Sequence, residues 1–181
     1  MRIIADDTMA LVIDLQEKLV PVIDNREEII CNTEILIKGL KALQVPILVT
    51  QQYTKGLGMT VPAILDLFGN EFRYEDKITF SCAEDDNILQ QIESSRKRTI
   101  IICGIEAHIC VLQTVVDLLA MDYRVILVED CIGSRRENDR KIGIQRAVAE
   151  GAILTTYESI LFELTRVAKT DVFKEISRLI K

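Results

Sequence analysis

Five short apolar runs recur along the chain, and longer stretches with helical spacing separate them. The runs are rich in Ile, Val and Leu and do not alternate with polar residues, and they span residues 9–13, 46–50, 99–103, 124–128 and 152–155. Strands show this pattern when helices cover both faces of a parallel sheet. The alternation of strands with helices therefore predicts a doubly wound α/β fold with right-handed crossover connections.

The stretches between these runs repeat apolar residues at intervals of three and four positions. This period predicts helices over residues 27–43, 109–121, 141–149 and 172–180. Gly151 is expected to end one helix, and Thr170 is expected to cap the last one. Thr155 and Glu158 are expected to form a capping box. Residues 53–82 are the least regular part, and a loop of that length often covers a functional site.

A chain of 181 residues suits a single domain, which we expect to span residues 1–181. A domain of this size buries enough apolar surface to fold without a metal or a disulfide. The five cysteines are odd in number and include no CxxC pair, so neither a disulfide framework nor a cysteine-rich zinc site is expected. Free thiols, and an amino terminus too acidic for a signal peptide, predict a location in the reducing cytoplasm.

The net charge of -6 argues against a general affinity for nucleic acid or for an anionic membrane, because both require a basic face. No apolar stretch reaches the roughly 20 residues that a membrane-spanning helix needs. The sequence also lacks the GxGxxG, GxxxxGKS/T and GxSxG motifs, so dinucleotide, P-loop and serine-hydrolase chemistry have no motif support. A small molecule is therefore the expected partner.

The segment GIEAHIC over residues 104–110 leads from a buried strand into a helix and places Cys110 in or next to the first helical turn. Unpaired N–H groups and a partial positive charge at a helix N-terminus favour a thiolate and lower the pKa of a cysteine there. The same N–H groups can hold the oxyanion that forms when a thiolate attacks a carbonyl. The residues alone leave two interpretations of Cys110 open, a nucleophile or a thiol packed between sheet and helix.

Asp14 lies where ligands bind in doubly wound sheets, at the carboxyl end of a strand. A carboxylate that closes the apolar run MALVI is costly to bury without a partner, so Asp14 either caps the next helix or acts as a general base for a thiol. Lys77, taken by itself, has the pattern of a surface residue and gains a role only if the fold brings it beside Asp14 and Cys110. His108 is the one histidine of the sequence. Side chains two positions apart point in different directions on a helix, so His108 and Cys110 are not expected to meet. We therefore interpret His108 as a loop or packing residue.

Four segments together resemble the isochorismatase-like cysteine hydrolases, the superfamily that includes nicotinamidases and N-carbamoylsarcosine amidases. The matching segments are ALVIDLQ at residues 10–16, DKITFS at 76–81, GIEAHICV at 104–111 and VEDCIGSR at 128–135. They occur in the order that the family has and cover nearly the whole chain. The segments TQQYTKGLG at 50–58 and VP at 61–62 are similar to the metal-free branch that includes the isochorismatase-domain proteins.

The resemblance implies a three-layer fold, with a six-stranded parallel sheet and helices on both faces. It implies a catalytic triad of Asp14, Lys77 and Cys110. It further implies a cis peptide bond between Ile105 and Glu106, with an oxyanion hole made by the backbone N–H groups of Glu106 and Cys110. Members of the family are usually oligomers, so we also expect a homo-oligomer.

Nicotinamidases hold a metal with an Asp-x-His pair and a further histidine after the second strand. This chain has Gln51 and Tyr53 at the corresponding positions and no second histidine. The resemblance therefore implies no catalytic metal and no cofactor, and it disfavours nicotinamide as the substrate.

The function that the resemblance implies is hydrolysis of an amide C–N bond in a small molecule. Cys110 forms a thioester intermediate in this scheme, with Asp14 as the base and Lys77 as the charge stabiliser. Two alternatives stay open: a vinyl ether hydrolysis of the isochorismatase type, which needs acid catalysis from Asp14, and a non-catalytic binding or scaffold protein. The substrate pocket is expected to be mostly apolar. The residues expected to line it are Leu15, Leu19, Gln52, Tyr53, Ile78 and Phe80.

Overall fold

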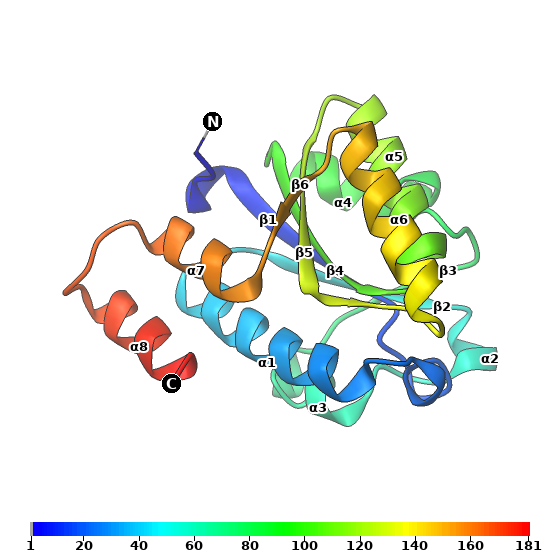
Figure 1. The fold of residues 1–181 in the computed structure, drawn as a ribbon, viewed down its shortest axis with the longest axis horizontal. Helices are drawn as coiled ribbons and strands as arrows, with labels where there is room; N and C mark the ends of the chain where they lie inside the picture. The colour runs from blue at the N-terminus through cyan, green and yellow to red at the C-terminus, as the bar shows by residue number, and fades with distance from the viewer. Residues whose placement is uncertain (1) are drawn as a thin grey trace.

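The computed structural model of the protein describes residues 2–181. Within them, six parallel strands form one sheet in the order β3-β2-β1-β4-β5-β6 (Figure 1). The strands are β1 (Thr8–Ile13), β2 (Ile47–Gln52), β3 (Glu75–Lys77), β4 (Thr99–Ile105), β5 (Arg124–Gly133) and β6 (Ile153–Thr155). The strand order changes direction between β1 and β4, as a doubly wound fold requires, and the predicted fold class is confirmed.

Helices cover both faces of the sheet and make three layers (Figure 1). One face carries α1 (Arg26–Ala42), α3 (Pro62–Leu65), α7 (Tyr157–Thr165) and α8 (Asp171–Leu179), and the other carries α4 (Asp86–Ser94), α5 (Leu112–Ala120) and α6 (Glu137–Glu150). The shorter helical segments are η1 (Ala5–Asp7), η2 (Val20–Val22), α2 (Thr54–Leu57), η3 (Gly69–Glu71), η4 (Cys82–Glu84) and η5 (Ala107–Val111). Among the described residues, no helix combines the length and the apolar character that crossing a membrane requires.

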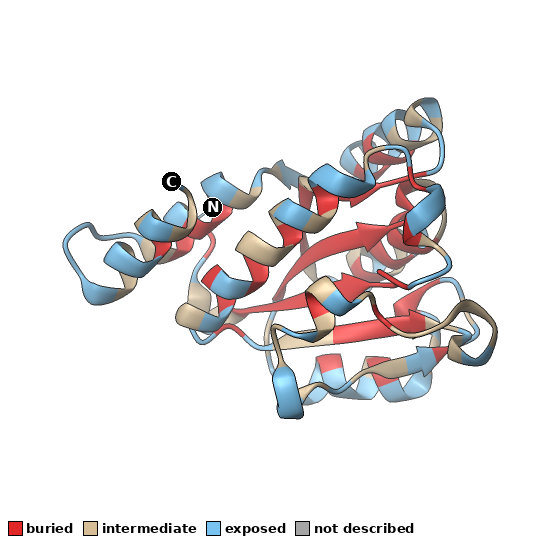
Figure 2. Cartoon of the chain, turned by 90° about the horizontal axis from the view of Figure 1, so that it is seen from below, coloured by how far each residue is buried: buried red, intermediate tan, exposed pale blue. Residues whose placement is uncertain are grey.

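The centre of the sheet is buried, because separate apolar cores fill the spaces on its two faces. Every residue of β1 and of β4 is buried, and Figure 2 shows the middle strands of the sheet in red. Successive side chains of β1 enter different cores: Val12 belongs to the core under α1, and Leu11 and Ile13 belong to the core under α5. The continuous apolar runs of the sequence follow from this coverage on both faces.

Two predicted helix boundaries are confirmed, and the predicted capping box is wrong. Gly151 ends α6 with a φ of 120°, and the Thr170 side chain accepts a hydrogen bond from a backbone N–H in the first turn of α8. Thr155, however, is the last residue of β6, so the helix can begin only after it. The cap of α7 is therefore Thr156, whose hydroxyl accepts a hydrogen bond from the Ser159 N–H.

The irregular segment 53–82 contains a strand that the apolar pattern does not predict. β3 lies at the edge of the sheet and pairs with β2, with Lys77 opposite Gln52 at the carboxyl end. Its sequence, Glu-Asp-Lys, contains no apolar run because an edge strand has a neighbour on one side only and meets solvent on the other. The apolar pattern also misses α4, although the Asp85 carboxylate caps that helix by accepting two backbone N–H groups.

Candidate active site

Three side chains from distant parts of the chain meet at the carboxyl edge of the sheet. Asp14 follows β1, Lys77 ends β3, and Cys110 lies in η5 shortly after β4. The Lys77 Nζ donates to the Asp14 Oδ2 over 2.8 Å, and both side chains are fully buried. The Cys110 thiol lies 4.0 Å from the Gln52 Oε1, which also accepts from Lys77, and the charges of Asp14 and Lys77 both act on it. The structure therefore brings a carboxylate, an ammonium and a thiol together.

The strand order explains this meeting. Because β1 lies between β2 and β4, and β3 lies beyond β2, the parallel strands deliver all three side chains to one edge. Gly104 allows β4 to approach β1 closely: its φ is 123°, and any side chain there would collide with the Ile13 carbonyl. Asp14 has a φ of 55°, a left-handed conformation that turns the chain out of the strand direction.

Lys77 is held by four acceptors around its Nζ. Besides Asp14, they are the Gln52 Oε1 at 2.6 Å and the carbonyl oxygens of Thr79 and Phe80 at 3.3 Å each. Burial lowers the pKa of Lys77, but the charge of Asp14 and two nearby cysteines outweigh burial, so the pKa is raised above its usual 10.5. Lys77 therefore stays protonated, and it is not the surface residue that its local sequence alone suggests.

Cys110 is a protonated thiol in the free protein, and the lowered pKa predicted from its helix position is wrong. Burial, and after it the negative charge of Asp14, raises the pKa of Cys110 well above its usual 9.0, and Lys77 offsets only part of this rise. Cys110 lies inside the π-helical turn η5, where desolvation outweighs the partial charge of the helix end. A base must therefore receive the thiol proton before Cys110 can act as a nucleophile.

Gln52 is the predicted pocket residue that reaches this group. Its Oε1 accepts from Lys77 and lies 4.0 Å from the Cys110 Sγ, while its Nε2 donates to the Ile78 carbonyl. Gln16 holds the backbone of Gln52, because its side chain donates to the Gln52 carbonyl and accepts from the Gln52 N–H over 2.7 Å. A fixed polar side chain therefore stands beside the sulfur.

The other predicted pocket residues fall into two groups. The first group follows the ends of β2 and β3 and is exposed, and we call it the apolar rim. It consists of Tyr53 (51% exposed), Ile78 (79%) and Phe80 (52%). Leu15 is fully buried in the core under α1, so its expected place in the pocket is wrong. Leu19 is partly buried against the same core, and its place in the pocket stays a prediction.

The turn between β4 and η5 is fastened by the loop that follows β5. The peptide bond between Ile105 and Glu106 is cis. The Glu106 carboxylate accepts hydrogen bonds from the Arg135 Nε at 3.0 Å and the Arg135 N–H at 2.9 Å, and the Ala107 N–H donates to the Ser134 Oγ. These contacts fix the backbone where the oxyanion hole is predicted. Ser134 and Arg135 end the segment VEDCIGSR, so the family resemblance carries a signal for them.

His108 belongs to a different part of the surface. Its Nδ1 lies 3.1 Å from the Ser134 Oγ, and it lines two cavities of about 180 and about 310 Å³ beside α5 and α6. Neither Asp14, Lys77 nor Cys110 lines these two cavities. His108 lies within η5 and not in a loop, and its contact with Ser134 agrees with the interpretation as a packing residue.

Gln51, at a position where the resemblance places a metal ligand of nicotinamidases, is occupied with other hydrogen bonds. Its Nε2 donates to the Thr60 Oγ at 2.9 Å, and its Oε1 accepts from the Thr54 hydroxyl at 2.7 Å. Over residues 2–181, no group of three or more His, Cys, Asp or Glu side chains is arranged to hold a metal ion. The absence of a catalytic metal stays a prediction.

Thr50 lies at this site, and the sequence patterns did not single it out. Its Oγ donates to the Asp14 Oδ1 at 2.8 Å, and its side chain is fully buried. Thr50 ends the apolar run 46–50, so the strand-end rule that selects Asp14 could have selected it too. Threonine is common in β-strands, so a threonine at the end of a strand does not by itself indicate a functional residue.

Comparison with known proteins identifies the family. The family model of the isochorismatase domain matches residues 8–159. The chain belongs to the isochorismatase family. This isochorismatase-family protein is 35% identical to isochorismatase domain-containing protein 2A of Mus musculus, with 99% of this chain and 85% of the relative covered. It is also 35% identical to isochorismatase family protein 1A of Dictyostelium discoideum, with 93% of this chain and 84% of the relative covered.

Solved structures extend the comparison. The MAR1 ribonuclease of Caenorhabditis elegans matches this isochorismatase-family protein with a TM-score of 0.93 and 36% identity, over 99% of this chain and 92% of that one. YcaC of Escherichia coli, described as an octameric hydrolase of unknown specificity, matches with a TM-score of 0.92 and 21% identity, over 99% and 89%. At that identity the likeness to YcaC shows the fold alone. The protein is a member of the isochorismatase-like cysteine hydrolases.

Proposed function

We propose that the protein hydrolyses an amide C–N bond of a small molecule, with Cys110 as the nucleophile. The observation that carries this proposal is the Asp14 carboxylate, which holds the buried ammonium of Lys77 over 2.8 Å and lies close enough to Cys110 for its charge to raise the pKa of the thiol. A thiol beside a base that a third group orients is an arrangement that activates a nucleophile. Because Cys110 rests as a thiol, Asp14 is the group that takes its proton.

The proposed reaction begins when the Cys110 Sγ attacks the carbonyl carbon while its proton passes to Asp14. The backbone N–H groups of Glu106 and Cys110 hold the oxyanion, and Lys77 stabilises the charge around Asp14. Asp14 then gives the proton to the leaving nitrogen, the C–N bond breaks, and an amine and a thioester remain. Water attacks the thioester while Asp14 takes its proton, which releases the acid, and that proton returns to the sulfur.

The apolar rim and Gln52 suggest the class of substrate. The rim offers exposed apolar surface from Tyr53, Ile78 and Phe80, and Gln52 offers one polar contact 4.0 Å from the Cys110 sulfur. Binding sites for small molecules combine apolar walls with a few placed polar groups in this way. A small amide without a net charge is therefore the substrate that we propose.

The pH dependence of Cys110 alkylation by iodoacetamide tests the role of Asp14 without a known substrate. In the wild-type protein, the rate is expected to stay level between about pH 6 and 9, because the proton moves inside the Asp14–Cys110 pair and does not leave it. The double variant Asp14→Asn/Lys77→Met keeps the thiol buried but has neither base nor ammonium. Its rate is expected to fall about 10²- to 10⁴-fold near neutral pH and to rise with pH, because only free thiolate reacts.

Mass spectrometry separates the cysteines in this experiment. Cys31 is exposed and serves as the internal reference, with the same rate in both proteins. Cys82, Cys103 and Cys131 are buried and are expected to stay unlabelled while the protein is folded. A wild-type rate at Cys110 that climbs with pH as steeply as that of the double variant contradicts the role of Asp14. A Cys110 as sluggish as the buried cysteines favours a binding or scaffold protein.

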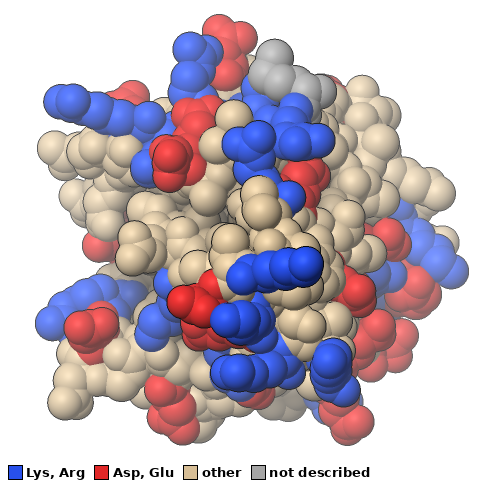
Figure 3. Space-filling model, turned by 90° about the vertical axis from the view of Figure 1, so that its left-hand side faces the viewer, with Lys and Arg blue, Asp and Glu red and all other residues tan. Residues whose placement is uncertain are grey.

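Two other reactions belong in the same assay. Hydrolysis of a vinyl ether needs acid from Asp14 and no thiolate, so a thiol that lies within the influence of the Asp14 charge favours an amide. The Caenorhabditis elegans relative is named a ribonuclease, but binding of RNA requires a basic face. This protein has a net charge of -6, and the side of the molecule that lies at the left of Figure 1 mixes Lys and Arg with Asp and Glu (Figure 3). RNA is therefore a negative control, not the proposed substrate.

Self-association through the apolar rim is part of the proposal. Exposed apolar side chains that cluster in this way commonly mark contacts between proteins. The octameric state given for YcaC of Escherichia coli supports an assembly of some size. In contrast, α8 packs against α1 and α7 of its own chain, and it is not the contact that we propose.

The variant Ile78→Asp is expected to form a smaller species than the wild-type protein in light scattering coupled to size exclusion. A carboxylate at this 79% exposed position cannot enter an apolar contact without losing its hydration. Val167→Asp is the matched control, because it makes the same kind of change at a 61% exposed valine beyond α7 and should leave the mass unchanged. A monomeric wild-type protein, or equal masses for Ile78→Asp and wild type, contradicts the proposed contact.

A further inference from the structure

The Asp14 carboxylate has two oxygens, and Lys77 accounts for only one of them. The other, Oδ1, accepts a hydrogen bond of 2.8 Å from the Thr50 Oγ. Thr50 is fully buried near the end of β2, and its Cα lies opposite that of Ile13, the residue before Asp14. We propose that Thr50 is a positioning residue that holds Asp14 for proton transfer from Cys110; this rests on the proposed function.

The direction of the bond follows from the chemistry of the partners. An ionised carboxylate only accepts hydrogen bonds, so the single hydroxyl proton of Thr50 points at Asp14. The lone pairs of the same hydroxyl face Cys82, whose Sγ donates from 4.0 Å. Burial raises the pKa of the Cys82 thiol to about 11, so Cys82 keeps its proton and remains a donor. The orientation of the Thr50 hydroxyl is thereby fixed from both sides.

The same buried residues also reach the nucleophile. The Cys82 N–H donates to the Thr114 Oγ at 2.9 Å, and the Thr114 hydroxyl donates to the Cys110 carbonyl at 2.7 Å. A continuous set of contacts therefore runs from Asp14 through Thr50, Cys82 and Thr114 to the turn that carries Cys110. The base and the nucleophile are fixed relative to one another by side chains that touch no substrate.

Two hydrogen bonds to different oxygens prevent the Asp14 carboxylate from rotating. Lys77 holds Oδ2 and Thr50 holds Oδ1, so the angle at which the carboxylate meets the Cys110 thiol is set by both. Without the Thr50 hydroxyl, Oδ1 is a buried acceptor without its partner, and the carboxylate turns to find another. A displacement of about 1 Å in a reacting group costs on the order of 10²-fold in rate.

The test compares Thr50→Val, which removes the hydroxyl and keeps the shape, with Thr50→Ser, which keeps the hydroxyl and removes a methyl group. The readout is the rate of Cys110 alkylation by iodoacetamide between about pH 6 and 9, resolved by mass spectrometry. Thr50→Val is expected to be about 10- to 100-fold slower at neutral pH, with a rate that now rises with pH, and Thr50→Ser to stay within about threefold of wild type. Should Thr50→Val not fold, Thr50→Ala replaces it with the same expectation.

Thr33→Val is the matched control, because Thr33 is also fully buried but lies on α1, and its rate should equal that of wild type. The variant Asp14→Asn/Lys77→Met, measured in parallel, separates the two claims. If it is labelled at the wild-type rate, the base role of Asp14 fails. If it is slow while Thr50→Val matches wild type, only the inference about Thr50 fails. Equal losses in Thr50→Val and Thr50→Ser also overturn it, because a variant that keeps the hydroxyl then loses as much rate as one that lacks it.

Discussion

Cys110→Ala is expected to abolish the hydrolysis of every small amide that the wild-type protein cleaves. In the proposed reaction the thioester forms on the Cys110 sulfur, so the rate should fall by roughly 10⁴-fold or more, as it does when a member of a cooperating catalytic group is lost. The measurement is release of ammonia or amine from a panel of small amides and ureides, with wild type and variant side by side. The thiol is nearly buried, and alanine fits in its place, so circular dichroism should show an unchanged fold.

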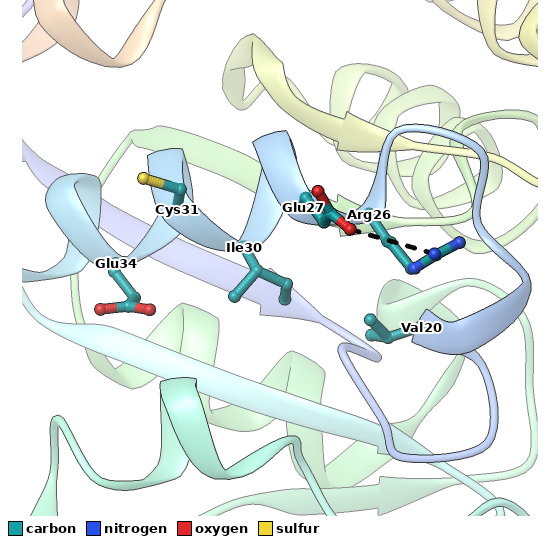
Figure 4. Close-up of a pocket in the computed structure, with 6 residues that line it drawn as sticks. All are labelled: Val20, Arg26, Glu27, Ile30, Cys31 and Glu34. Atoms are coloured by element: carbon teal, nitrogen blue, oxygen red, sulfur yellow. Dashed lines mark ion pairs between the residues drawn. The ribbon is translucent and has the colours of Figure 1, made fainter.

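Cys31→Ala provides the control for this loss. It makes the same chemical change at an exposed cysteine, which lies with Ile30 and Glu34 at a shallow hollow of about 370 Å³ on α1 (Figure 4). The helix α1 covers one face of the sheet, while Cys110 belongs to the core on the opposite face. Cys31→Ala is therefore expected to keep full activity. A folded Cys110→Ala that retains wild-type turnover would refute the thioester mechanism.

Lys77→Met is expected to lower the free energy of unfolding by about 3–5 kcal/mol, because it leaves the Asp14 charge buried without its partner. The ion pair has an N–O distance of 2.8 Å, and both side chains are fully removed from solvent. Methionine has nearly the shape of the lysine stem, so the loss reports the charge and not a cavity. Urea unfolding followed by circular dichroism measures the change.

The double variant Asp14→Asn/Lys77→Met supplies the control for stability. It has no unpaired charge, so most of the lost free energy should return, while the hydrolytic activity stays absent. The pKa of Lys77 is raised above 10.5, so the pair stabilises the wild-type protein fully below that pH, and the stabilisation disappears as the pH rises through the raised value. At alkaline pH, the difference in the free energy of unfolding between the wild-type protein and the double variant should therefore become smaller. A single variant as stable as the double variant contradicts this account.

The sequence predicted the central strands well because burial on both faces leaves a strong mark. β1 and β4 consist largely of Ile, Leu and Val, since no position on them meets water. β3 has no such mark, because the edge of the sheet tolerates Glu75 and Asp76. The capping box failed for a related reason: the pattern cannot tell that Thr155 still belongs to a strand, and boundaries depend on where the neighbouring strand ends.

The sequence predicted which residues form the candidate site, but it did not predict how their environment shifts their pKa values. Asp14 and Cys110 follow buried strands, so the strand-end rule found both, whereas Lys77 depended on the family resemblance because its strand is short and polar. The direction of the pKa shift of Cys110 depends on burial and on the nearby Asp14 charge, which only the folded structure supplies. Thr50 was hidden because its hydroxyl matters only through the carboxylate that it meets.

The placement of Lys77 on β3 sets a limit on how the enzyme fails when heated. β3 has three residues and pairs with β2 alone, so few backbone bonds hold it. The edge strands of a sheet unfold locally at a lower cost in free energy than the strands in its middle. When β3 frays, the ammonium departs from Asp14 although β1, β4 and β5 remain intact. We therefore expect the protein to lose activity at a temperature below the melting point of the core, because activity depends on the pairing of this one edge strand.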